Sequence, residues 1–107
     1  MVELESFRNL ALSLPGAVEA PHFEKNSFRI KKKIFATLDS QNKRAVLKLS
    51  PEDQSVFCAF DSSVFYPVPN KWGKQGWTMV ELKKVRKDMC QDALKQAYYT
   101  VSGKREK

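Results

Sequence analysis

Lysine and arginine side chains are concentrated in residues 25–48, which hold eight cations and a single acid, Asp39. Ammonium and guanidinium groups donate hydrogen bonds to phosphate oxygens, and such contacts carry affinity without sequence information. The formal net charge of +7 is therefore unevenly distributed, and a potential of this kind attracts polyanions. We expect seven of these cations to contact the phosphates of a nucleic acid: Arg29, Lys31, Lys32, Lys33, Lys43, Arg44 and Lys48. The structural alternative is that lysines on exposed strands simply prevent edge-to-edge association of sheets.

A second candidate region is the loop at residues 70–76, where Lys71 and Lys74 flank Trp72. Aromatic rings among cations are typical of surfaces that bind single-stranded nucleic acid, because unpaired bases stack on them. Since Trp72 lies in a loop, we expect its ring to be exposed. Trp77 follows on an alternating strand, and we expect Trp77 and Phe65 to fill the core instead.

The single histidine, His22, has Glu19 and Glu24 nearby in sequence, so a general base oriented by a carboxylate is conceivable. No nucleophile or second partner lies at a recognisable spacing. We therefore expect a structural histidine and no catalytic residues, and a small-molecule pocket near His22 is kept as an alternative.

No metal or cofactor site is predicted. One histidine and two widely separated cysteines, Cys58 and Cys90, do not form a zinc signature. Both cysteines fall within predicted helices, where we expect buried, unreactive thiols. Several acids could in principle meet in space to bind metal, but the basic character of the chain argues against it: Glu19, Glu24, Glu52, Asp53 and Asp61.

These candidate residues are positioned by a predicted meander of three antiparallel strands within residues 27–49. Phe28 and Ile30 alternate with polar residues, as do Ala45 and Leu47, so one face buries apolar groups while the other presents cations. Residues 34–38 show little polar alternation, which predicts a strand covered on both faces. Residues 39–42 form a turn cluster.

Helical spacing predicts a first helix over residues 4–14, ended by Pro15-Gly16, and a last helix over residues 85–102. Ser50-Pro51 begins a middle helix with a buried stripe expected at Val56, Phe57, Ala59 and Phe60. Strands are expected at 17–24, as an edge strand, and at 64–66 and 77–82. The order α-β-β-β-β-α-β-β-α indicates an α+β fold, in which a two-layer antiparallel sheet has its helices on one face.

At 107 residues, with 42% hydrophobic and 29% charged residues, the chain is an ordinary globular domain. We expect one domain over residues 1–103 and a basic tail over 104–107. No apolar run approaches the ~20 residues of a membrane span. The acidic N-terminus lacks the apolar segment of a secretory signal, and two cysteines fit reduced thiols, so we expect a cytoplasmic protein. We also expect a monomer.

Particular residues, in this order, resemble the MmcQ/YjbR family of small bacterial proteins. The resemblance covers nearly the whole chain and is carried by residues 12–16 (LSLPG), His22-Phe23, Ser27-Phe28-Arg29, residues 33–36 (KIFA), Leu47-Lys48, Trp72-Gly73, Gly76-Trp77 and Ala97-Tyr98. It implies a fold similar to bacterial frataxin (CyaY-like) and a "double wing" nucleic-acid-binding role for two β-hairpins, with no catalytic residues. Family members often have glycine in the turn that Lys31–Lys33 fills here. Lysine tolerates a positive φ less well than glycine, which predicts a longer or differently shaped hairpin tip.

Taken together, these features predict a non-enzymatic module that binds DNA or RNA, mainly through phosphate contacts. The alternatives are a protein-interaction module that docks an acidic partner, and a small-molecule-binding protein.

Overall fold

The computed structural model describes residues 2–22 and 25–103, with the side chains of His22 and Lys25 excepted. Six strands form one antiparallel sheet in the order β1-β2-β3-β4-β6-β5. The elements in chain order are α1 (Leu4–Leu12), β1 (Val18–His22), β2 (Lys25–Ile30), β3 (Lys33–Asp39), β4 (Arg44–Lys48), α2 (Pro51–Phe60), β5 (Phe65–Pro67), α3 (Lys71–Lys74), β6 (Trp77–Glu81) and α4 (Lys87–Ser102).

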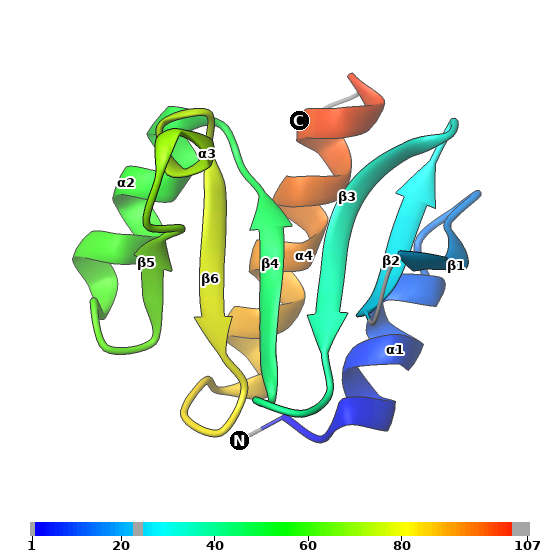
Figure 1. Ribbon diagram of the computed structural model, residues 1–107, viewed down its shortest axis with the longest axis horizontal. Helices are drawn as coiled ribbons and strands as arrows, with labels where there is room; N and C mark the ends of the chain where they lie inside the picture. Colours follow the sequence, from blue (N-terminus) through cyan, green and yellow to red (C-terminus); the bar gives the residue numbers. More distant parts are fainter. Residues whose placement is uncertain (1, 23–24, 104–107) are drawn as a thin grey trace.

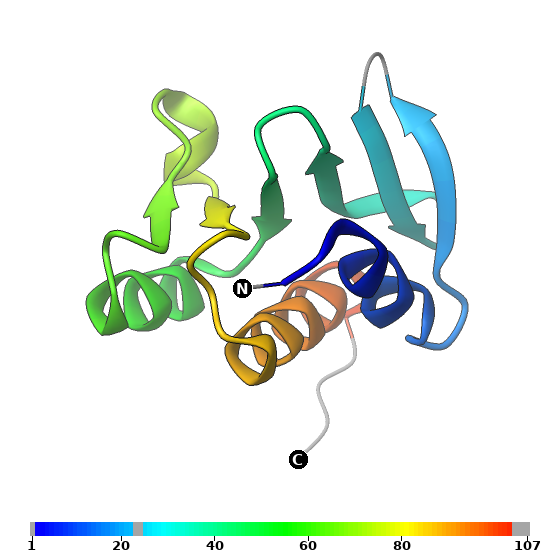
Figure 2. The same ribbon diagram turned by 90° about the horizontal axis from the view of Figure 1, so that it is seen from below.

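The three long helices, α1, α2 and α4, lie on one side of the sheet, whereas the short α3 lies at the other side (Figures 1 and 2). This arrangement confirms the predicted two-layer α+β fold with its meander and its edge strand. We call the side of the sheet away from the three helices the open face. Among the described residues, no helix has both the length and the apolar character that crossing a membrane requires.

The core lies between the sheet and the helices and is rich in aromatic pairs. Phe7 of α1 meets Phe28 of β2, with ring centroids 5.7 Å apart, and Phe57 of α2 meets Phe65 of β5 at 5.1 Å. Such pairs prefer tilted or edge-to-face contact because of the ring quadrupole. The predicted cap of α2 is confirmed, since Ser50 Oγ accepts a hydrogen bond from the backbone N–H of Asp53 at 3.1 Å.

Three expectations about burial and local structure were wrong. In α2 only Phe57 is buried, while Val56 and Phe60 are 65% and 63% exposed and Ala59 is exposed too, because α2 packs through one narrow side beside β5. Residues 34–38 are not covered on both faces, since Ile34 and Thr37 are only half-buried. The polar loop at 70–76 contains the single-turn helix α3.

The connections of the meander separate the two ends of the sheet. The β2–β3 turn, the end of β4 and the start of β6 lie at one end, which is the upper end in Figure 1. The β3–β4 turn and the end of β6 lie at the lower end. Because alternate turns of a meander fall at opposite ends, this geometry decides which of the predicted cations can act together.

Candidate nucleic-acid interface

Six lysines from three parts of the chain gather at the upper end of the sheet. Lys48, at the end of β4, is half-buried and the other five are exposed. Among the described residues, none of the six forms an ion pair with a carboxylate. We call this set the upper rim: Lys31, Lys32, Lys33, Lys48, Lys71 and Lys74.

The β2–β3 turn is shorter than the sequence led us to expect. Ile30 pairs directly with Lys33, so only Lys31 and Lys32 connect the strands. Both residues have positive φ, 53° and 68°, as a two-residue turn of type I′ requires. Two adjacent lysines therefore adopt a left-handed conformation that Asn-Gly adopts more easily.

Lys43 and Arg44 lie at the lower end, apart from the upper rim. Arg44 Nε donates to Glu81 Oε2 at 2.9 Å, and the Tyr66 hydroxyl donates to the same oxygen. Burial, together with this hydrogen bond to Glu81, raises the pKa of Tyr66. Lys43 lines a shallow depression with Glu3 and Glu5 and other residues. The structure thus does not bring these two predicted cations to the others, and a carboxylate neutralises Arg44.

Arg29 lies in β2 close to the β2–β3 turn, where it is the cross-strand partner of Ile34. Its Nε donates to Ser27 Oγ at 3.1 Å, and Ser27 in turn donates to the backbone carbonyl of Ala20 at 2.9 Å. Ser27 pairs across the strands with Thr37, which lines a groove on the open face. Since residues two apart on a strand share a face, Arg29 also belongs to the open face.

Trp72 and Trp77 stand beside the upper rim. The two ring centroids are 6.4 Å apart, and the ring planes are inclined at 65°. Trp72 is 51% exposed, as predicted, but Trp77 is half-buried on the open face, so its predicted place in the core was wrong. Alternation along β6 indicates two faces, and the helices cover the face of Thr78 and Val80 instead.

Lys48 is the cation closest to this aromatic pair. Its Nζ lies 5.7 Å from the centroid of the Trp77 ring and donates to the backbone carbonyl of Gln75. A cation at this distance from an indole is attracted to the negative face of the ring. Burial lowers the pKa of Lys48.

A groove of about 420 Å³ runs over the open face below the two tryptophans. β3 contributes Ile34 and Thr37 to it, β4 contributes Val46, and β6 contributes Met79. The centre of this face is therefore apolar, and the cations that the sequence predicted across it lie mainly at its upper end. An open apolar groove with cations at one end can hold a flat apolar group whose attached anion reaches the lysines.

Two glycines place α3 and both tryptophans. At Gly76, which has φ +106°, a Cβ atom would lie 1.8 Å from the carbonyl oxygen of Leu49. At Gly73 a Cβ atom would lie 2.2 Å from the carbonyl oxygen of Val68. Only glycine allows these close approaches of backbone to backbone. The glycines of the Trp72-Gly73 and Gly76-Trp77 motifs are therefore positioning residues.

Gln54 of α2 ties the same loop to the helix layer, which the sequence did not indicate. Its Nε2 donates to the carbonyl of Gly73 at 2.9 Å, the carbonyl of Trp77 at 3.2 Å and Oγ1 of Thr78 at 3.1 Å. A glutamine in the polar first turns of a helix gives no signal that it reaches a loop 19 residues away in sequence.

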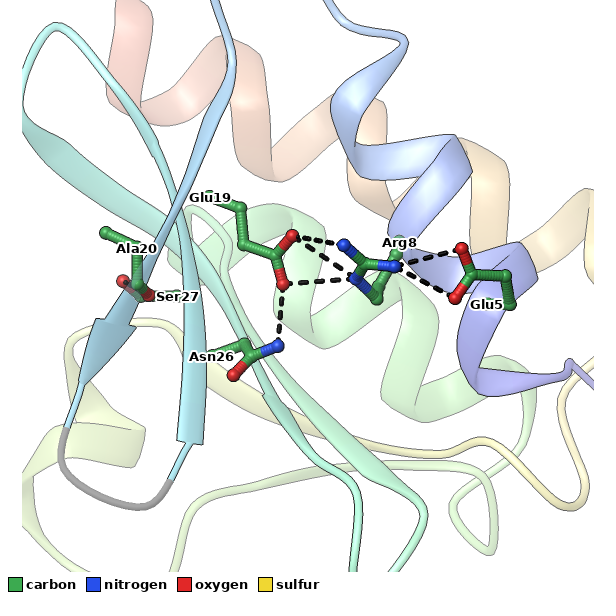
Figure 3. Close-up of polar contacts among 6 residues, drawn as sticks. All are labelled: Glu5, Arg8, Glu19, Ala20, Asn26 and Ser27. Atoms are coloured by element: carbon green, nitrogen blue, oxygen red, sulfur yellow. Dashed lines mark hydrogen bonds and ion pairs between the residues drawn. The ribbon is translucent and has the colours of Figure 1, made fainter.

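A separate ion-pair cluster joins β1 to α1 (Figure 3). Arg8 Nη2 lies 2.7 Å from Glu19 Oε1, Arg8 Nη1 lies 2.9 Å from Glu5 Oε2, and Asn26 Nδ2 donates to Glu19 Oε2 at 2.6 Å. The hydrogen bonds from the Arg8 guanidinium lower the pKa of Glu19. The carboxylate considered as a partner for His22 is therefore engaged by Arg8. The His22 side chain and Glu24 lie outside the described residues.

The two cysteines are free thiols. Cys90 is buried in α4, and burial raises its pKa to about 12; Cys58 is half-buried, and burial raises its pKa as well. A thiol with a raised pKa is a weak nucleophile because little thiolate is present. Within residues 2–22 and 25–103, no three His, Cys, Asp or Glu side chains are grouped closely enough to hold a metal ion.

Known proteins share this fold, and a family model matches the sequence. The structure is similar to the crystal structure of the Deinococcus radiodurans protein DR2400, described with the domain DUF419, at a TM-score of 0.80 and 22% sequence identity over 99% of this chain and 84% of that one. No match was found among curated proteins. The family model YjbR matches residues 12–100. Because this match spans most of the described sequence, the chain belongs to the YjbR family.

Proposed function

We propose that this protein is a non-enzymatic module that binds DNA or RNA through the upper rim, with Trp72 as an aromatic contact. The observation that carries the proposal is that six lysines, without carboxylate partners among the described residues, lie along the same end of the sheet as an exposed tryptophan. Ammonium groups that no acid neutralises release counterions from a polyanion, and this release supplies most of the non-specific affinity for nucleic acid.

The conformation of the β2–β3 turn supports the proposal. Lys31 and Lys32 hold left-handed φ angles that disfavour residues with a Cβ by roughly 1–2 kcal/mol each. Lys43 in the β3–β4 turn has the same φ as Lys31, so it is the placing of two adjacent cations at one tip, and not the strain alone, that points to a function. Two long cationic side chains at a projecting tip suit contact with a phosphate backbone, whereas Asn-Gly would suit the turn alone.

The contrast between the two ends of the sheet also supports it. At the lower end Arg44 is paired with Glu81, whose Oε2 also accepts from Tyr66. At the upper end, by contrast, none of the six lysines is paired with a carboxylate among the described residues, so we expect nucleic acid to be steered there. We expect the protein to act as a monomer in the cytoplasm, where free thiols such as those of Cys58 and Cys90 persist.

A salt titration tests the proposal. The affinity of the protein for a labelled oligonucleotide would be measured by fluorescence anisotropy at several salt concentrations. We expect the combined variant Lys31→Asn, Lys32→Asn, Lys33→Gln to lower the slope of log K against log salt by about 2, because each lost phosphate contact removes roughly 0.7 on a single strand. Asparagine suits the left-handed turn positions, so the fold should be kept.

The matched control removes three exposed lysines elsewhere, through Lys83→Gln, Lys87→Gln and Lys95→Gln. The control has the same net charge as the upper-rim variant, so a change that depended only on total charge would affect both equally. We expect its salt slope to stay within about 0.5 of the wild-type value. Equal effects of the two triple variants, or no binding by the wild type at low salt, would contradict the proposal.

A second candidate function rests on α2. Phe60 is exposed and lines a shallow pocket with Lys84, Arg86 and Asp61, and Arg86 is paired with Asp88, so an apolar ring stands beside one cation that forms no ion pair among the described residues. Such a surface suits an acidic partner protein that carries an apolar anchor. This function predicts that Phe60→Ser weakens the binding of an acidic amphipathic peptide, measured by calorimetry, while the upper-rim variant binds it normally.

A further inference from the structure

We infer that the groove on the open face is a stacking site for an unpaired base, so that the preferred nucleic acid is single-stranded. This inference rests on the proposed function and specifies its substrate. In this inference the base contacts Trp72, Trp77 and the apolar centre of the sheet, whereas the phosphates contact the lysines.

The geometry of the two tryptophans leaves a ring face for a ligand. Their planes are inclined at 65°, so the rings meet edge to face and do not cover one another. Trp72 remains 51% exposed although it stands beside an apolar groove. An indole in this setting offers a stacking surface, and every base has a flat face that fits one.

The groove has the size and lining that a base requires. Its volume of about 420 Å³ falls within the range of pockets that bind small ligands. Val46 and Met79 supply apolar surface from the strands, and Thr37 supplies a hydroxyl among the lining residues. The thioether of Met79 is adaptable and favours contact with aromatic rings.

The cations beside the groove favour a ligand that carries phosphates as well as a base. Lys48 lies against the Trp77 ring, and Lys71 adjoins Trp72 in sequence. A chain crossing the upper end can therefore place its phosphates on the lysines and its bases toward the rings. The bases of a duplex are paired and stacked within the helix, so a duplex would reach the lysines and leave the groove empty.

The lysine next to Trp77 adds to this argument. Burial lowers the pKa of Lys48, so its ammonium group is partly deprived of water in the free protein. A phosphate placed beside it would supply the missing anion. The charge on Lys48 and the ring of Trp77 therefore favour a ligand that carries an aromatic ring and an anion close together.

Intrinsic fluorescence tests the inference cleanly because the chain has two tryptophans and both line this groove. The protein would be titrated with a 12-residue oligothymidylate, with a duplex of the same length, and with an abasic strand that keeps the phosphates but has no bases. Anisotropy of labelled strands would report binding separately. We expect the oligothymidylate to quench the fluorescence and to bind roughly 10-fold more tightly than the abasic strand.

Two variants form the matched pair for this test. Trp72→Ala removes an exposed ring beside the groove, and Phe60→Ala removes an exposed ring on the opposite side of the sheet. We expect Trp72→Ala to reduce the preference for oligothymidylate over the abasic strand to less than about 3-fold, and Phe60→Ala to leave it unchanged. Since both side chains are more than half exposed, both variants should fold.

The results separate failure of the inference from failure of the proposed function. Equal affinities for the oligothymidylate and the abasic strand, or tighter binding of the duplex, would overturn the base site while phosphate binding stands. Binding of thymidine monophosphate as tightly as the oligonucleotide would overturn it in favour of a small-molecule site. Fluorescence that changes with protein concentration alone would overturn it in favour of a second copy of the chain. No binding of any strand would overturn both.

Discussion

Lys48 and Trp77 are direct cross-strand partners in β4 and β6, and the Lys48 ammonium lies 5.7 Å from the centroid of the Trp77 ring. This pair connects the cationic upper rim with the apolar groove, because Lys48 belongs to the upper rim and the Trp77 ring lines the groove. The start of β6 is paired with the end of β4, and a hydrogen bond from the Leu49 N–H to the carbonyl of Gly76, at 3.0 Å, continues that pairing.

Gly76→Ala should therefore destabilise the protein and disturb the groove together. The new Cβ would lie 1.8 Å from the Leu49 carbonyl oxygen, and φ would remain at +106°, so backbone must move. We expect a loss of more than about 3 kcal/mol in the free energy of unfolding, measured by urea denaturation.

Gly103→Ala is the matched control for that change. Gly103 ends α4 with φ +76°, but a Cβ atom there would meet nothing within 4 Å. Only the left-handed conformation disfavours alanine, so we expect a loss of about 1 kcal/mol. Similar losses for the two variants would show that the close approach at Gly76 is not what requires glycine.

Lys31→Gly and Lys43→Gly form a second matched pair. Both lysines have φ 53° and both are exposed, and they lie in turns at opposite ends of the sheet. Each change relieves a left-handed lysine and removes one cation, so each should stabilise the fold by roughly 0.5–1 kcal/mol in urea denaturation.

Their effects on binding should differ. Lys31→Gly should lower the salt slope for a single strand by about 0.7, whereas Lys43→Gly should leave it nearly unchanged. A larger effect of Lys43→Gly would mean that the strand crosses the lower end of the sheet, where Arg44 and Glu81 are paired.

The ion pair between Arg8 and Glu19 should make stability depend on pH in a defined window. The hydrogen bonds from Arg8 lower the pKa of Glu19 below its ordinary value of 4.5. A depressed carboxyl pKa contributes stability that is complete above 4.5 and is lost as the pH falls through the folded-state pKa. Glu19→Gln should therefore be less stable than wild type at pH 7, and the difference should shrink as the pH falls below 4.5 and through the folded-state pKa of Glu19.

Urea denaturation between about pH 2.5 and 7 would measure this difference. Glu5→Gln serves as the control, since Glu5 contacts the same guanidinium with a side chain that is 70% exposed and is screened by water. A Glu19→Gln effect that did not change with pH would show that the pair stabilises the fold through packing alone.

The order of the main helices and strands could be predicted from the sequence because it depends on local periodicity. Phe28 and Ile30 alternate along one strand, and Ser50-Pro51 begins a helix, so short windows contain the necessary information. The four-residue helix α3 was missed because its residues, Lys71-Trp72-Gly73-Lys74, are too few to show a helical period.

Which face of an element is covered could not be read from the same pattern. Alternation showed that Trp77 and Thr78 point to opposite faces of β6, but both choices of buried face fit the sequence. The helices cover the face of Thr78, so Trp77 is left on the open face. The exposure of Val56 and Phe60 has the same origin, because α2 contacts the sheet beside β5 through Phe57.

The separation of Lys43 and Arg44 from Lys31 could have been predicted. Successive turns of a meander lie at opposite ends of the sheet, so the two groups of cations could not form one patch once three strands were assigned. The contact between Arg44 and Glu81 required knowing that β6 lies beside β4, which joins residues 37 positions apart.

Mapping the bound strand on the protein by NMR tests the central claim most directly. Amide and indole shifts of ¹⁵N-labelled protein would be followed during titration with the 12-residue oligothymidylate. We predict that the perturbed residues lie at 31–34, at Lys48 and at 71–77, and that both indole signals shift. Perturbations confined to Lys43 and Arg44, or to α1 and α4, with unchanged indole signals, would contradict the account.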